Sequence, residues 1–222
     1  MIELSLKTGF ARIERTLQWA AGGQLRFAAA QALNDIARAA RDAINERMGE
    51  IFDNPTPFTR RAVVAPRELA ARKEHLVATV TVRPVQSRYL LREEIGGTRT
   101  AAENVKPSAA LVLPGRALTR NAFGNIPRGI LRGLARQSKR KTKHGDRAGT
   151  VVFLPAGVPA NKAHIGGYFR RTAGGLSRLT VFEEATHYEP RFHFRDRVAE
   201  VARRDWAETF RRRFAEAIET AR

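Results

Sequence analysis

Residues 24–48, QLRFAAAQALNDIARAARDAINERM, carry a strong helical pattern. Its apolar residues recur at the i, i+3, i+4, i+7 spacing that places them on one side of an α-helix. The apolar stripe consists of Ala29, Leu33, Ile36, Ala37, Ala40 and Ile44. The opposite side is charged and contains Arg38, Arg41, Asp42 and Glu46. The pattern predicts a long amphipathic helix from about Gln24 to Met48, with one face that must be buried against other elements.

The C-terminal region predicts a second long helix, which begins between Pro190 and Asp196 and ends near Thr220. Its larger apolar residues repeat every four positions, at Val198, Ala202, Trp206, Phe210, Phe214 and Ile218. A strict four-residue step drifts around a helix that has 3.6 residues per turn. We therefore expect the apolar stripe to wrap around this helix, in a way that suits packing on a sheet or on a neighbouring subunit.

Several shorter segments alternate in the manner of strands. In residues 75–82, Leu76, Ala78, Val80 and Val82 fall on one face of a strand. Further strands are expected over residues 2–6, 62–65, 109–113, 150–154, 164–170 and 179–186, and short helices over 8–22, 87–95 and 126–137. These elements predict an α+β fold, in which a mostly antiparallel sheet is packed by the N-terminal-half helix and the C-terminal helix. We expect a single domain over residues 1–222, with a long basic loop insertion at about 116–147.

The strongest compositional signal is positive charge. The chain has 40 Lys and Arg against 22 Asp and Glu, a formal net charge of +18, with a pI near 11.5. A field of this size implies contact with a polyanion or with an acidic protein surface. Most of the cations are arginines, which suit bidentate contacts with phosphate or carboxylate. The alternative explanation of the charge is that the coding genome favours arginine codons, so that the arginines lie on solvated surfaces.

Half of this charge lies in residues 116–147, where ten basic residues accompany one acidic residue, Asp146. The basic residues, which are the candidate partner- or DNA-binding residues, are Arg116, Arg120, Arg128, Arg132, Arg136, Lys139, Arg140, Lys141, Lys143 and Arg147. Three uses remain open for this segment. It can follow a phosphate backbone without reading bases, it can order against an acidic partner surface, or it can be a solvated loop.

Other classes of protein are disfavoured by composition. The chain contains no cysteine, which excludes disulfides, thiolate catalysis and cysteine-ligated zinc. No run of eighteen apolar residues and no basic-then-apolar leader pattern is present, so we expect neither a membrane-spanning nor a conventionally secreted protein. The 43% hydrophobic content is sufficient for a globular core.

No constellation of residues predicts catalysis, a cofactor or a metal site. The five histidines do not have ligand spacing, and the pairs Glu93–Glu94 and Glu183–Glu184 are read as solvated or salt-bridged because adjacent side chains point apart. The glycine pairs are interpreted as turns. A nuclease that uses Asp53 and Glu74, with Lys73 beside Glu74, is a weak alternative.

The order of several short segments resembles that of the tail completion proteins of long-tailed phages, the family that includes minor tail protein Z. These segments are Ala32-Leu33-Asn34-Asp35-Ile36-Ala37-Arg38, Pro55-Thr56-Pro57-Phe58-Thr59-Arg60-Arg61-Ala62, Tyr89-Leu90-Leu91-Arg92-Glu93-Glu94-Ile95-Gly96-Gly97, Leu111-Val112-Leu113-Pro114-Gly115 and Asn121-Ala122-Phe123-Gly124-Asn125-Ile126-Pro127-Arg128-Gly129, followed by the arginine-rich terminal helix. Together they cover most of the chain.

The resemblance implies a non-enzymatic structural protein of the virion, located in the neck at the head-proximal end of the tail and assembled in the host cytoplasm. Such proteins form rings around the DNA channel, so the expected partners are further copies of this chain (a hexamer), the tail terminator or tail tube protein, head connector proteins, and packaged DNA through non-specific contacts. No cofactor is expected. The alternative hypothesis is a sequence-independent nucleic-acid-binding protein.

Overall fold

A computed structural model describes residues 3–7, 22–103, 110–140, 148–155 and 166–220. The chain divides into two compact units. Unit 1 contains residues 1–96 and 189–222, and unit 2 contains residues 97–188. Helices and antiparallel sheets occur together, so the predicted α+β class is confirmed.

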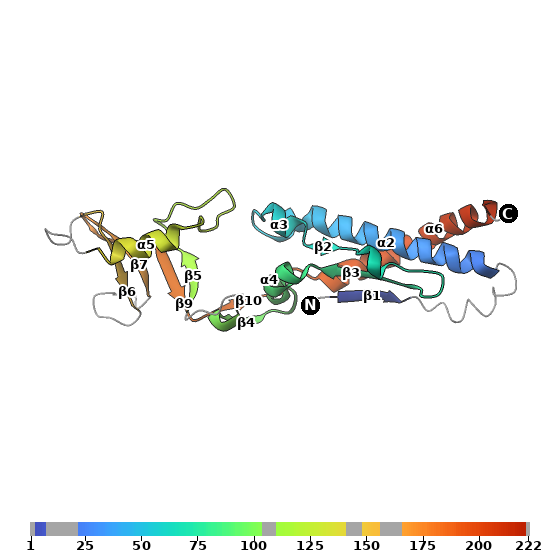
Figure 1. Ribbon diagram of the computed structural model, residues 1–222, viewed down its shortest axis with the longest axis horizontal. Coiled ribbons are helices and arrows are strands. Elements are labelled where there is room, and N and C mark those ends of the chain that lie inside the picture. Colours follow the sequence, from blue (N-terminus) through green and yellow to red (C-terminus); the bar gives the residue numbers. More distant parts are fainter. Residues whose placement is uncertain (1–2, 8–21, 104–109, 141–147, 156–165, 221–222) are drawn as a thin grey trace. The chain divides into compact units, whose positions relative to one another are not determined.

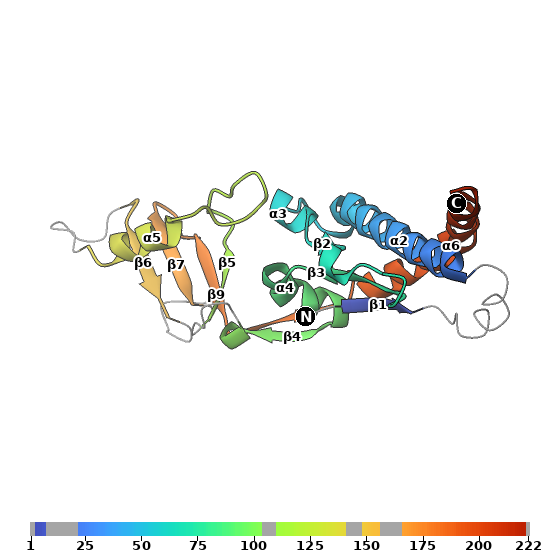
Figure 2. The same cartoon turned by 45° about the vertical axis from the view of Figure 1, so that its right-hand side comes forward.

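Unit 1 is built on two long helices, α2 (Gly22–Ile51) and α6 (Phe194–Glu219), which pack along one another (Figures 1 and 2). Strands β1 (Glu3–Lys7), β3 (Val77–Val82) and β2 (Val63–Val64) form an antiparallel sheet in the order β1-β3-β2, and β3 packs on α2. The shorter helices are α3 (Pro57–Arg60), α4 (Pro84–Ile95) and the 3-10 turn η1 (Arg67–Leu69). The two long helices and β3 occur where the sequence predicts them.

The core of unit 1 is assembled from the predicted apolar faces. Every residue of the predicted α2 stripe is buried, and so are Ala78, Val80 and Val82 of β3. On α6, Val198 is buried, whereas Trp206, Phe210 and Phe214 are half-buried and Ile218 is exposed. The α6 stripe therefore leaves the core along the helix, as its four-residue step predicts.

Two asparagines of α2 hold backbone segments against the helix. The side-chain amide of Asn34 donates to the carbonyl of Ala71 (3.0 Å) and accepts the N–H of the same residue (2.8 Å). Asn45 makes the same pair of bonds with Val63 of β2, at 3.0 and 3.2 Å. Eleven residues correspond to three turns of helix, so both amides project from one side of α2. Backbone groups that have no strand partner there are satisfied in this way.

The described part of unit 2 contains short strands and one α-helix. The strands are β4 (Gly97–Thr100), β5 (Leu111–Pro114), β6 (Val151–Leu154), β7 (Gly167–Thr172), β8 (Gly175–Arg178), β9 (Thr180–Glu183) and β10 (Ala185–Tyr188). They form three antiparallel sheets, β10-β4, β5-β9 and β6-β7-β8. The helix is α5 (Ile130–Ser138), and η2 (Ala101–Glu103) is a 3-10 turn. A small core of Leu118, Leu134, Val151 and Leu179 holds the unit together.

Some predicted details are wrong. Among the described residues the strands form four separate sheets instead of the expected single sheet. The expected strand 179–186 is split into β9 and β10, because β9 pairs with β5 whereas β10 pairs with β4. The short helix expected over 126–137 is present as α5, and Leu118 and Leu134 of the basic segment 116–147 belong to the unit 2 core. The expected helix over 8–22 lies almost entirely outside the described residues. The single-domain interpretation stays a prediction.

The chain enters and leaves unit 2 at adjacent points. Strands β4 and β10 pair so that Gly97 lies opposite Tyr188. Each hydrophobic core also draws its residues from one unit alone. Paired antiparallel residues are only about 5 Å apart, so a short glycine–serine linker can replace residues 97–188. We expect unit 1 with this linker to remain helical and to unfold cooperatively. Circular dichroism and urea denaturation measure this, and a non-cooperative, largely unfolded product would show that the chain folds as one inseparable domain.

Gly167 is a point of close approach in unit 2. A Cβ atom at this position would lie 2.1 Å from the backbone oxygen of Thr180, so β7 and β9 could not keep their present spacing. We expect Gly167→Ala to lower the free energy of unfolding by about 1–3 kcal/mol. Gly133→Ala is the matched control: it lies within α5 with open space around it, and it should raise stability by up to about 1 kcal/mol. Equal thermal stability of the two variants would contradict this account of β7 and β9.

Candidate partner-binding surface

Helix α5 is amphipathic, with its basic side facing solvent. It follows Pro127 and Gly129, whose positive φ of 82° turns the chain into the helix. Successive residues turn by about 100°, so Arg132, Arg136 and Lys139 fall within a narrow arc on the side opposite Leu134. Leu134 is buried in the unit 2 core, whereas the three basic residues are exposed. Burial of the apolar side therefore fixes the direction in which the basic side points.

The chain leading to α5 is held at two points. The N–H of Gly115 donates to the carbonyl of Leu179 (2.9 Å), beside β9. Further along, the side-chain oxygen of Asn121 accepts the N–H groups of Phe123 (3.0 Å) and Asn125 (2.9 Å), and so closes a turn. Residues 116–128 therefore follow a defined path.

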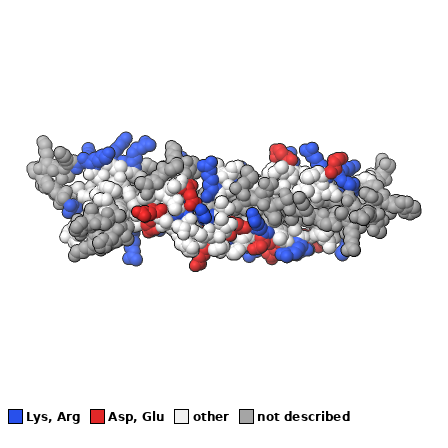
Figure 3. Space-filling model, turned by 90° about the horizontal axis from the view of Figure 1, so that it is seen from below, with Lys and Arg blue, Asp and Glu red and all other residues white. Residues whose placement is uncertain are grey.

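Seven of the ten predicted basic residues lie in the described part of the chain, and all seven are exposed. They are Arg116, Arg120, Arg128, Arg132, Arg136, Lys139 and Arg140. Lys141, Lys143 and Arg147 lie outside the described residues. Within the described ranges, none of the seven forms an ion pair with a carboxylate. Figure 3 shows basic side chains gathered along one edge of the part that contains α5 in Figure 1.

The arginines of unit 1 are placed differently, because many are paired with carboxylates of the same unit. Ion pairs with carboxylates are formed by Arg38, Arg41, Arg47, Arg191, Arg204, Arg212 and Arg213. In the full sequence, unit 2 has sixteen basic and four acidic residues, a net charge of +12, and unit 1 has twenty-four and eighteen, a net charge of +6. Two thirds of the net charge therefore belongs to unit 2.

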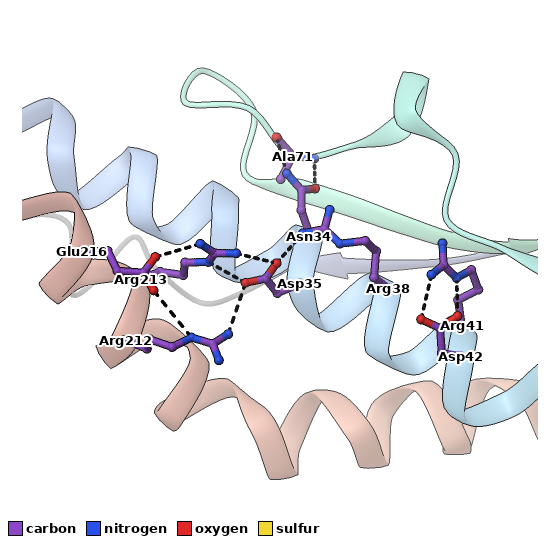
Figure 4. Close-up of polar contacts among 9 residues, drawn as sticks. All are labelled: Asn34, Asp35, Arg38, Arg41, Asp42, Ala71, Arg212, Arg213 and Glu216. Carbon is purple, nitrogen blue, oxygen red and sulfur yellow. Dashed lines mark hydrogen bonds and ion pairs between the residues drawn. The ribbon is translucent and has the colours of Figure 1, made fainter. Parts of the chain in front are cut away.

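Asp35 is the centre of the largest of these ion-pair groups in unit 1 (Figure 4). Arg213 of α6 donates two hydrogen bonds to its carboxylate, at 2.6 and 3.0 Å, and Arg212 and Arg38 also contact it. Glu216 accepts a further bond from Arg213 at 2.8 Å. Burial alone would raise the pKa of Asp35, but Arg213 and Arg38 outweigh it and lower that pKa. The same bond raises the pKa of Arg213, so both groups are charged across the physiological range.

We expect Asp35→Asn to lower the free energy of unfolding by about 1–2 kcal/mol at pH 7, between the values typical of exposed and buried pairs. The folded-state pKa of Asp35 is depressed, so its stabilisation is present above the unfolded pKa of about 4 and is lost as pH falls through the folded value. The variant should therefore lose less stability than the wild type between pH 5 and about pH 2, as measured by urea denaturation.

Asp42→Asn is the matched control for this prediction. Asp42 also lies on α2 and pairs with an arginine, but its partner is the neighbouring Arg41 and its side chain is 55% exposed. Its loss should change stability by less than about 1 kcal/mol. If both substitutions destabilise the protein equally, the contact between α2 and α6 is not the source of the effect.

The Glu93–Glu94 pair, interpreted from the sequence as solvated or salt-bridged, joins α4 to the start of α6. The carboxylate of Glu93 is buried and accepts two bonds from Arg191, at 2.5 and 3.1 Å. The carboxylate of Glu94 accepts the backbone N–H of Phe194 at 2.6 Å and so caps α6 from another element. Phe192 and Phe194 are fully buried beside this junction. Sequence reasoning missed this role because the paired residues lie about one hundred positions apart.

The residues of the nuclease alternative are far apart. The Lys73 ammonium lies 5.2 Å from the ring centre of Phe27, near the start of α2, and Glu74 follows it. Asp53 comes two residues after the other end of α2, so roughly 36 Å of helix separates the two carboxylates. The ranges that the structure describes also contain no cluster of three potential metal ligands. Asp53 and Glu74 thus do not converge on one site.

Comparison with known proteins finds no matching family model, no matching curated protein and no matching solved structure. Within the described residues, no helix combines the length and the apolar character needed to span a bilayer. The candidate surface therefore rests on its own geometry: an exposed row of cations that have no carboxylate partner in the part of the chain that the structure describes, carried by a small folded unit.

Proposed function

We propose that this chain is a structural component of the phage neck, which completes the tail and joins it to the head around the DNA channel. The observation that carries this proposal is the division of charge between a body in which at least seven arginines pair with carboxylates of the same unit and a second unit whose exposed cations have no carboxylate partner among the described residues. A ring subunit needs both a rigid body and a surface left over for its neighbours.

The segments that resemble the tail completion family support the proposal, because several of their residues make structural contacts. Asn34 holds Ala71, Asp35 pairs with Arg213, and Glu93 and Glu94 anchor the start of α6. Segments whose residues make framework contacts suit a protein whose task is assembly.

On this proposal the partners are further copies of the chain, arranged as a hexameric ring, with the tail terminator or tail tube protein on one side and head connector proteins on the other. The site of action is the neck of the virion, after assembly in the host cytoplasm. Contacts made by the basic surface should weaken as salt is raised, because exposed charges are screened.

The second candidate is a sequence-independent nucleic-acid-binding protein, which the unpaired cations of unit 2 also favour. The two functions differ in assembly. A neck component should form discrete rings or attach to tails, whereas a general nucleic-acid-binding protein should coat DNA as monomers.

We expect negative-stain electron microscopy and mass photometry to show discrete rings, either of the purified protein or after it is mixed with isolated tails. Changing Lys139, Arg140, Lys141 and Lys143 to Gln should leave the circular dichroism spectrum unchanged but reduce attachment to tails. A protein that stays monomeric and never attaches to tails, although it is folded, would contradict the neck role.

A further inference from the structure

We infer that the exposed side of α5, together with the loop before it, binds the phosphate backbone of duplex DNA without reading base sequence. The inference deepens the proposed function, on which its biological setting rests, by naming the ligand of the basic surface. The contact itself can be measured on the purified protein.

The spacing of the basic residues suits an extended polyanion. Arg132, Arg136 and Arg140 follow one another at four-residue steps, and the first two lie within α5. A rise of 1.5 Å per residue puts about 6 Å between Arg132 and Arg136, and Arg140 follows two residues after the end of α5. Duplex DNA carries one charge per roughly 1.7 Å of its axis, so about three or four phosphate charges lie along the roughly 6 Å between the first two. The row can thus meet several phosphates at once.

These guanidinium groups are available to a ligand. None of the three is paired with a carboxylate within the described ranges, so binding DNA does not require an existing ion pair to be broken. The same is true of Arg116, Arg120 and Arg128 in the preceding loop. Arg38 and Arg213 of unit 1 instead pair with the carboxylate of Asp35, which largely compensates their charge within the fold.

The composition of this surface favours duplex DNA over an acidic protein. Protein interfaces are enriched in aromatic residues, methionine and arginine, and depleted in lysine and in acidic residues. Here the exposed side of α5 is basic, and the exposed large apolar residues of the described segment, Phe123 and Ile130, are each only 36% exposed. A single partly exposed aromatic also does not provide the stacking platform that single-stranded DNA requires.

Base reading is not expected from this surface. Sequence-specific contacts in the major groove use arginine or lysine to guanine and asparagine or glutamine to adenine, placed by a helix that enters the groove. Gln137 is the one amide on the exposed part of α5, and it lies about 140° around the helix from Arg132. Contacts confined to the backbone position a protein on DNA without specifying sequence.

The test is fluorescence anisotropy of the full-length protein with a labelled 30-base-pair duplex, at salt concentrations from 50 to 200 mM. Each phosphate contact contributes roughly one unit to the slope of log affinity against log salt. The variant Arg132→Gln/Arg136→Gln/Arg140→Gln should have a slope shallower by about three and an affinity lower by roughly tenfold or more at low salt. Replacing the same residues by Lys should preserve the slope.

The matched control is Arg88→Gln/Arg203→Gln/Arg211→Gln, which removes the same charge from exposed positions on α4 and α6 of unit 1. Its slope should change by less than one. If both glutamine triples lower the slope equally, binding reflects overall charge and the α5 site is wrong. Tighter binding to polyglutamate than to DNA at the same salt, or affinities that differ between two unrelated duplex sequences, would also overturn the inference.

Two further measurements keep the outcome interpretable. Circular dichroism establishes that each variant is folded, and the single variant Arg136→Gln, with an expected slope change of about one, replaces the triple if the triple does not fold. If the protein forms rings or attaches to tails but does not bind DNA, the DNA inference is wrong and the neck role stands. DNA binding by a protein that never forms rings or attaches to tails would remove the neck role and leave the α5 contact standing.

Discussion

Unit 1 depends on the packing of α2 against α6, because α2 is the element to which nearly everything else in the unit is attached. Alanines at positions 29, 37 and 40 are buried and leave room for neighbouring backbone to approach closely. The same helix packs on β3, and through Asn34 and Asn45 it also holds the chain near Ala71 and Val63. A hydrophobic stripe alone would allow the two helices to slide past one another. The bidentate contact between Asp35 and Arg213 selects one alignment, since a carboxylate and a guanidinium meet in this way only at a defined position.

The charge of the chain has two physical roles. In unit 1, arginine pairs with nearby carboxylates and joins segments, as Arg191 does with Glu93 and Arg213 does with Asp35. In unit 2, the exposed cations of residues 116–140 have no carboxylate partner among the described residues. The formal net charge of +18 for the whole chain does not distinguish the paired arginines of unit 1 from the exposed cations of unit 2. What bears on binding is the charge left after internal pairing, and this is concentrated in unit 2, where acidic residues are few.

The parts of the fold that sequence predicts well are those specified by local periodicity. Helices α2 and α6 and strand β3 each carry an apolar pattern long enough to define both the type of element and its buried face. The division of residues 179–186 into β9 and β10 could not be predicted, since it depends on pairing with strands more than sixty residues away. For the candidate surface, residue type and spacing indicate the basic side of α5, and Leu134 identifies its buried side. Whether a given arginine already has a carboxylate partner is a tertiary property, as the Glu93–Arg191 pair shows.

The connection between the units sets a further constraint. A two-stranded ribbon such as β4-β10 is marginally stable by itself, so unit 2 must be held together by its own interior. That interior is small, and it lies in a unit of net charge +12, whose cations repel one another. An anionic partner that binds the folded unit reduces this repulsion and favours the folded state by mass action. Stability and binding are therefore linked in unit 2: the charge that weakens the isolated unit is the same charge that draws a polyanion to α5.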